Sequence, residues 1–95
     1  MAAFIVATVR ITDQEQFAAY AKSVAGLSER YGGESLVRGA VSEVLEGGSP
    51  VGERVVVTRF PDAEAARAYI GSAEYQAARV NRAAAAQTEM RLVIA

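Results

Sequence analysis

The sequence predicts a single α+β domain over residues 1–95, in which two helical segments alternate with four strands in the order βαββαβ. Three observations support this. The runs 3–11 and 54–60 are rich in β-branched residues and apolar on both faces, which is typical of central strands covered on both sides. Amphipathic segments with capping residues follow both runs. The run 34–46 carries charged residues along its length, and the run 88–94 carries them on one face, as edge strands do.

The first strand, 3–11, leads directly into a helix. Thr12 and Glu15 form a predicted capping box for its amino terminus. Apolar residues then recur at spacings of three and four, at Phe17, Tyr20, Ala21, Val24, Leu27 and Tyr31. We expect the helix to continue to Gly32–Gly33, where a residue with positive φ can end it.

The second half begins with the edge strand 34–46, which we expect to bend near Gly39, and residues 47–50 turn it back as a hairpin. No loop is expected to exceed about six residues. After the strand 54–60, Pro61 ends the ladder and Asp62 caps a second helix. Gly71–Ser72 interrupts this helix, and Ser72 caps a continuation to about residue 86. Strict alternation over 88–94 predicts a half-covered edge strand.

Two right-handed crossovers on this element order give a ferredoxin-like, four-stranded antiparallel sheet with strand order 4-1-3-2 and two helices on one face. The first and third strands, both apolar on two faces, then fall in the centre. The face away from the helices receives no cover from its own chain. We expect a homodimer through this open sheet face, since the alternative cover, a long loop, does not suit the short connections.

Composition narrows the chemistry. A net charge of −1 gives no reason to expect binding to nucleic acid. The absence of cysteine excludes a disulfide, a thiolate nucleophile and a zinc–sulfur site. The absence of histidine removes the commonest metal ligand and general base. We expect no metal and no cofactor. The amino terminus lacks a basic leader region and no run approaches 18 apolar residues, so we expect no membrane partner. Absence of cysteine is compatible with a cytoplasmic location, which we expect.

Several short motifs occur together along the chain: Tyr31-Gly32-Gly33, Leu36-Val37-Arg38-Gly39, Leu45-Glu46-Gly47, Phe60-Pro61, and Ser72 with Glu74-Tyr75-Gln76 and Arg82. Together they resemble the bacterial family catalogued as domain of unknown function thirteen-thirty, over essentially the whole chain. The resemblance implies membership of the dimeric α+β barrel superfamily, and so a homodimer. Relatives there include cofactor-free oxygenases, isomerases and haem-handling proteins. It implies no catalytic role for any residue.

The chain departs from that family pattern at four places. Ala40 stands where a second glycine is usual, and Ala73 replaces a proline after Ser72. Tyr69-Ile70 replaces a common Trp-Tyr pair, which could change the wall of a pocket. The chain ends at Ala95, where a glycine is typical.

Six residues are candidates for a ligand pocket: Arg38, Tyr20, Tyr69, Tyr75, Arg79 and Arg82. Arg38 could clamp an anion through its forked donors, or be an edge-strand charge paired with a glutamate. Tyr75, Arg79 and Arg82 share one helix face and could line a cleft with Arg38, or form a solvated helix border. Tyr20 and Tyr69 lie on apolar stripes and could equally be core.

Three functions fit these features. The first is a homodimer with a pocket for a small acidic or phenolic molecule between helices and sheet, which could be a cofactor-independent enzyme. The second is a non-catalytic dimeric binding or accessory module. The third, an RNA-binding domain, is the weakest, because Val55-Val56-Val57 offers no stacking aromatic side chain and the net charge is negative. The sequence does not decide whether the protein is an enzyme.

Overall fold

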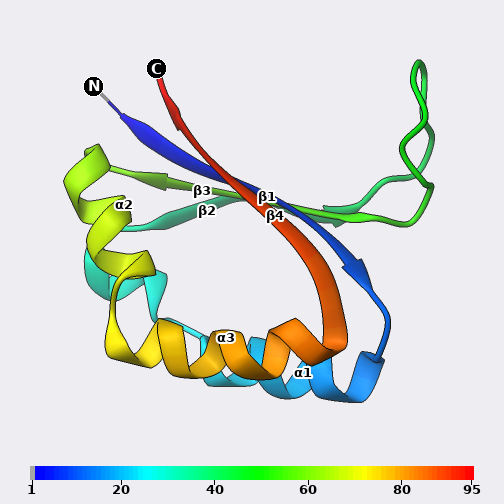
Figure 1. The fold of residues 1–95 in the computed structure, drawn as a ribbon. Coiled ribbons are helices and arrows are strands. Elements are labelled where there is room, and N and C mark those ends of the chain that lie inside the picture. The colour runs from blue at the N-terminus through cyan, green and yellow to red at the C-terminus, as the bar shows by residue number, and fades with distance from the viewer. Residues whose placement is uncertain (1) are drawn as a thin grey trace.

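Four antiparallel strands form one sheet, and the helices lie on one side of it (Figure 1). The computed structural model describes residues 2–95. The strands are β1 Ala3–Ile11, β2 Glu34–Ala40, β3 Arg54–Phe60 and β4 Ala86–Ile94. The α-helices are α1 Gln14–Ser23, α2 Ala63–Ile70 and α3 Ala73–Ala85, and a 3₁₀ helix, η1, spans Ser28–Tyr31.

The strand order is β2-β3-β1-β4, which confirms the ferredoxin-like sheet with the predicted strands at its centre. Along β1, alternate residues are buried against the helices: Ala3, Ile5, Ala7 and Val9. The strand register places residues of β3 and β4 on this same face, since Ala3 lies opposite Phe60 of β3 and Ile94 of β4. The intervening residues, including Phe4 and Val6, point to the other side.

The core lies between the sheet and α2 with the start of α3. Phe60 and Tyr75 are its largest fully buried side chains. Tyr69 packs between them, with ring centroids 5.6 Å from Phe60 and 5.0 Å from Tyr75. This aromatic cluster joins α2 and α3 to β3 of the sheet.

Two of the predicted helix caps are confirmed, and one is wrong. Asp62 accepts a hydrogen bond from the Ala65 amide at 2.8 Å, and Ser72 accepts one from the Tyr75 amide at 3.2 Å. Thr12 does not cap α1. Its amide donates to the Ala85 carbonyl at 2.7 Å, which keeps it at the end of the strand, so Asp13 becomes the cap.

The first helix is shorter than its apolar stripe predicts. It ends at Ser23, and Gly26, at φ 75°, turns the chain before η1 begins. Gly32, at φ 85°, ends η1 as predicted for a left-handed terminator. The stripe residue Leu27 is still buried, because the turn delivers it to the core.

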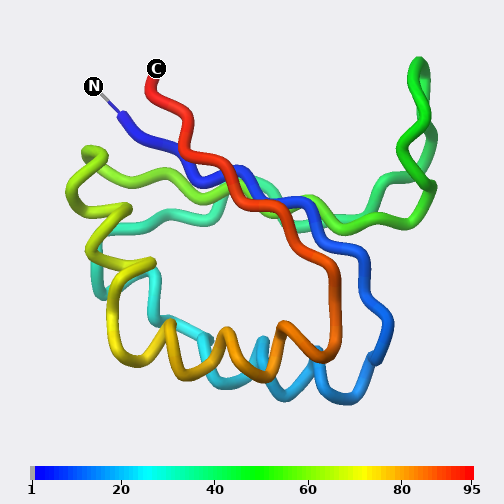
Figure 2. Tube along the Cα trace, in the orientation of Figure 1, coloured from blue at the N-terminus to red at the C-terminus, as the bar shows by residue number. Residues whose placement is uncertain are grey.

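The hairpin between β2 and β3 is also longer than predicted. β2 ends at Ala40, and residues 41–53 form an arm that rises from the end of the sheet on the side away from the helices (Figures 1 and 2). Its base is closed by the Val41 amide to the Glu53 carbonyl at 2.8 Å and by the Gly52 amide to the Val41 carbonyl at 2.9 Å. The expectation of no loop beyond six residues is therefore wrong. Even so, Val37 and Val93 on the open face stay 47% and 44% exposed.

Across residues 2–95, no helix has both the length and the apolar character needed to cross a membrane.

Candidate functional site

Arg82 of α3 is the centre of a polar cluster between the helices and the sheet. Its Nη1 donates to the Tyr20 hydroxyl of α1 at 3.4 Å and to the Tyr75 hydroxyl of α3, and lies 3.6 Å from Met90 Sδ of β4. The Tyr75 hydroxyl in turn donates to Met90 Sδ at 2.9 Å. Three separate elements thus bring their side chains to one guanidinium. We call Arg82, Tyr20, Tyr75 and Met90 the Arg82 cluster.

The guanidinium of Arg82 has aromatic neighbours, and no carboxylate of the described residues pairs with it. Its Cζ lies 5.4 Å from the centroid of the Tyr20 ring and 5.6 Å from that of the Tyr75 ring, within cation–π range. Within residues 2–95 the ion pairs are Arg10 with Glu53 and Arg30 with Glu74, and neither involves Arg82. A half-buried positive charge is therefore held by neutral groups.

The protonation states follow from burial. Burial raises the pKa of Tyr75 to about 12, although the Arg82 charge and hydrogen bond oppose the rise. Burial also raises the pKa of Tyr69, with Arg82 and Arg38 acting in the opposite direction. For Arg82, burial lowers the pKa, but the Tyr75 and Tyr20 hydroxyls outweigh it and leave the pKa above its ordinary value. At neutral pH the site therefore holds a charged Arg82 guanidinium and a neutral Tyr75 phenol.

The structure brings four of the six predicted pocket residues together and leaves two apart. Tyr20, Tyr75 and Arg82 belong to the cluster, and the Tyr69 ring packs against the Tyr75 ring at a tilt of 58°. Arg38 lies on β2, and its register partner Val56 places it on the helix side of the sheet, where its charge acts on Tyr69. It is exposed and forms no ion pair within residues 2–95, so the predicted glutamate partner is not seen.

Arg79 does not join the cluster. It is exposed and donates to Gln76 Oε1 on its own helix at 3.4 Å. The prediction that Arg79 shares a helix face with Tyr75 and Arg82 includes too many residues. The buried face of α3 consists of Tyr75, Ala78 and Ala85.

Met90 is the residue that sequence reasoning missed. The alternation of apolar and polar residues predicts that Met90 shares one face of an edge strand with Thr88 and Leu92. This face points toward the helices, because Met90 lies opposite the buried Ala7. Thr88 lies on the same face, opposite Val9. Its hydroxyl is buried and has no hydrogen-bond partner within residues 2–95. The helix side of β4 therefore presents a sulfur and an unsatisfied hydroxyl near the cluster.

An apolar groove of about 360 Å³ runs beside the cluster, between α2 and β4. Its lining includes Ile5, Ala66, Ile70 and Leu92, with Arg67 as a charged member. Met90 also lines it. Since Met90 also contacts Tyr75 and Arg82, its side chain belongs to both the groove and the polar cluster.

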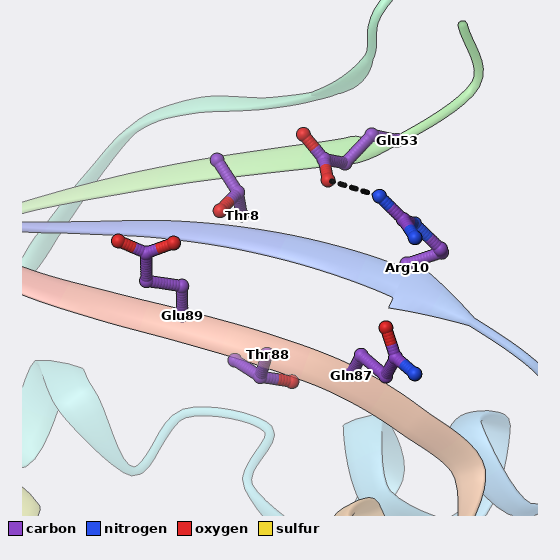
Figure 3. Close-up of a pocket in the computed structure, with 6 residues that line it drawn as sticks. All are labelled: Thr8, Arg10, Glu53, Gln87, Thr88 and Glu89. Atoms are coloured by element: carbon purple, nitrogen blue, oxygen red, sulfur yellow. Dashed lines mark ion pairs between the residues drawn. The ribbon is translucent and has the colours of Figure 1, made fainter. Parts of the chain in front are cut away.

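A second hollow, of about 260 Å³, lies at the far end of the sheet. Figure 3 shows its polar lining, with Arg10 Nη2 lying 3.9 Å from Glu53 Oε2 and Glu89 on the neighbouring strand. None of the six predicted pocket residues lines it. No group of three or more carboxylate, histidine or cysteine side chains among the described residues could hold a metal ion.

The fold has solved relatives of low sequence identity. A protein of unknown function from Rhodopseudomonas palustris superposes with a TM-score of 0.83 at 21% identity, covering 97% of this chain and 80% of that one. A dimeric ferredoxin-like protein of unknown function from Jannaschia sp. CCS1 has a TM-score of 0.75 at 14% identity, with both chains fully covered. The cofactor-independent oxygenase SnoaB from Streptomyces nogalater has a TM-score of 0.71 at 15% identity, covering 99% and 92%.

These similarities define the chain as a ferredoxin-like α+β protein. Residues 2–95 match the family model described as Domain of unknown function (DUF1330), and the chain belongs to that family. The resemblance seen in its short motifs is thereby confirmed. No curated protein matches the chain.

Proposed function

We propose that the protein is a homodimer in which each subunit binds a small organic acid or phenol between its helices and its sheet. The open sheet face supports the dimer. It presents the apolar side chains of Phe4, Val6, Val37, Val55, Val57 and Val93, and no segment of the described chain covers them. A second copy is the simplest cover for such a patch. The Jannaschia relative, described as dimeric, is consistent with this.

Arg82 is the observation that carries the ligand proposal. Removing a guanidinium from water without a counter-ion is costly, and neutral phenol oxygens repay only part of that cost. A carboxylate or phenolate would complete the site, because the guanidinium fork matches two oxygen acceptors.

The tyrosines supply donors for the same ligand. The Tyr20 and Tyr75 hydroxyls accept from Arg82, which leaves their own protons free to donate. The Tyr75 proton now points to Met90 Sδ, a weak acceptor. A ligand oxygen is a better acceptor and would draw this proton away from the sulfur.

The groove beside Met90 fits the apolar part of such a ligand. Its volume of about 360 Å³ is in the range of small-molecule sites. Rotation of the flexible Met90 side chain would join the groove to the cluster, since methionine adapts easily to a new neighbour. The ligand would then lie with its acidic end on Arg82 and its body between α2 and β4.

Two activities suit this geometry. A guanidinium and two tyrosine hydroxyls could stabilise an enolate or phenolate during a reaction that needs no cofactor. The second candidate is a non-catalytic binding module. It is favoured by Tyr75, because a hydroxyl that retains its proton to about pH 12 is a poor general base near neutrality.

Replacing Arg82 tests the ligand proposal. Wild-type protein, Arg82→Gln and Arg79→Gln would be incubated with benzoate, 4-hydroxybenzoate and hexanoate, and binding followed by thermal shift and native mass spectrometry. Arg79 is the matched control, since it lies on the same helix outside the cluster. We expect at least one of the three to bind wild type and Arg79→Gln, and Arg82→Gln to bind about tenfold more weakly. Equal binding by folded Arg82→Gln, or no binding by wild type, would refute the proposal.

A further inference from the structure

The groove between α2 and β4 combines an apolar lining with positive charge. Its lining includes two arginines, Arg67 of α2 and Arg91 of β4. None of the described residues that line it carries a carboxylate. The strand register places Arg91 on the open sheet face, opposite Val6, so Arg67 is the cation of the groove on the helix side. The groove therefore suits a ligand that is apolar along its body and negative near Arg67.

Arg67 is available to an anion. It is exposed and forms no ion pair within residues 2–95. Glu64 lies three residues earlier on α2, a spacing at which side chains of a helix can meet, yet the two residues do not pair. The core does not use Arg67 either, because the buried residues of α2 are Ala66 and Tyr69. A carboxylate that enters the groove would therefore displace no acidic partner from Arg67.

Two guanidinium groups approach this one groove from separate helices. Arg82 Nη1 of α3 lies 3.6 Å from Met90 Sδ, and Met90 lines the groove. Arg67 lies one helical turn before the junction of α2 and α3, since its carbonyl accepts the Gly71 amide at 2.9 Å. That turn is about 5 Å long. A ligand that reaches both charges therefore needs an apolar spacer between its two acidic groups.

We infer that the ligand of this site carries two acidic groups, one at each end of an apolar body. The first, a carboxylate or phenolate, binds Arg82, and the second, a carboxylate, binds Arg67. An arginine suits the second position as well as the first, because its guanidinium fork matches both oxygens of a carboxylate. The inference rests on the function proposed above and narrows its ligand class to an apolar dicarboxylate or carboxyphenol.

The second acidic group changes affinity in a direction that depends on Arg67. A carboxylate that enters an apolar groove loses water, and this costs free energy unless a cation compensates. With Arg67 present, a diacid should bind more tightly than the monoacid of the same length. Without Arg67, the same diacid should bind more weakly than the monoacid. The sign of the difference between the two ligands therefore reports on this residue.

Matched pairs of ligands test the inference. Within the pair hexanoate and adipate, and within the pair benzoate and terephthalate, only the second carboxylate differs. Isothermal titration calorimetry would measure their binding to wild type, Arg67→Gln and Arg79→Gln. We expect wild type to bind the diacid of at least one pair about fivefold more tightly than the monoacid, and this advantage to shrink in about 0.5 M salt. Arg67→Gln should bind that diacid more weakly than the monoacid, with its affinity for the monoacid unchanged.

Arg79→Gln is the matched control. It removes the same charge from an exposed residue of α3 that does not line the groove, so the advantage of the diacid should stay as in wild type. A loss of this advantage in Arg79→Gln as large as in Arg67→Gln would show that only overall charge matters, and would refute the contact with Arg67.

The outcomes separate this inference from the proposed function. If wild type binds a monoacid through Arg82 and neither diacid binds more tightly, the second acidic group is refuted and the proposed function stands. An advantage of the diacid that survives in Arg67→Gln would also refute this inference alone. A wild type that binds neither the monoacids nor the diacids would refute both.

Discussion

The Tyr75 hydroxyl should make the stability of this protein depend on pH in the alkaline range. Its pKa is raised from 10.0 to about 12 in the folded state. Below pH 10 the phenol is protonated whether the chain is folded or unfolded, so it contributes no pH dependence there. Above pH 10 the unfolded chain releases the proton while the folded chain retains it. The free energy of unfolding therefore falls as pH rises toward 12.

The size of the effect follows from the two pKa values. A difference of two pKa units corresponds to about 2.7 kcal/mol at full deprotonation, of which about 2 kcal/mol should be lost by about pH 11.5. Tyr69, whose pKa is also raised by burial, should add to the loss. Tyr75 is 1% exposed, so solvent screens its side chain only weakly.

Urea unfolding followed by circular dichroism would measure the loss at several pH values from 9 to about 11.5. Tyr75→Phe removes the titrating hydroxyl and should flatten the slope, at a cost of about 1 kcal/mol at neutral pH for the lost hydrogen bonds. A wild type whose stability is constant over this range, or a Tyr75→Phe variant that loses stability as steeply as wild type, would refute the reasoning.

Two further predictions concern the packing that supports the site. Gly33→Ala should destabilise the protein by about 1–3 kcal/mol, because the added Cβ would lie 2.8 Å from the Ser28 carbonyl oxygen and 3.0 Å from Phe60 Cε1. Thermal unfolding would measure the loss. Gly48→Ala is the control, since no atom lies within 4 Å of the Cβ that it adds. A Gly33→Ala variant as stable as Gly48→Ala would contradict this. Ser72→Ala should cost about 1 kcal/mol, because it removes the cap of α3, and unchanged urea stability would show that the cap is dispensable.

Much of the fold could be predicted from local patterns. The runs 3–11 and 54–60 became β1 and β3 with the predicted bounds, and their two apolar faces placed them in the centre of the sheet. Asp62 and Ser72 were recognised as caps because an acceptor side chain before an apolar stripe acts within one helical turn. Such signals depend on neighbours in the sequence.

The errors arose where a long-range contact competed with a local signal. Thr12 lost its role as a cap to a bond with the carbonyl of Ala85, far along the chain. Gly26 lies within the apolar stripe that continues to Tyr31, so the periodicity gives no sign of the turn that Gly26 makes. The sequence predicts strand and a short turn in place of the arm, since the valines and leucine of residues 41–53 suit a strand as well as an exposed hairpin.

The residue types of the candidate site could be predicted from the sequence, but not the full set of residues that form it. The sequence by itself indicates six candidates. Tyr20 and Tyr69 lie on apolar stripes, Tyr75, Arg79 and Arg82 share one helix face, and Arg38 is a charge on an edge strand. Only the tertiary structure decided that Arg79 lies outside, that Met90 lies inside, and that Arg82 has no carboxylate beside it. Periodicity tells which residues share a face of one element, whereas the site forms where faces of α1, α3 and β4 meet, and that meeting depends on how the whole core packs.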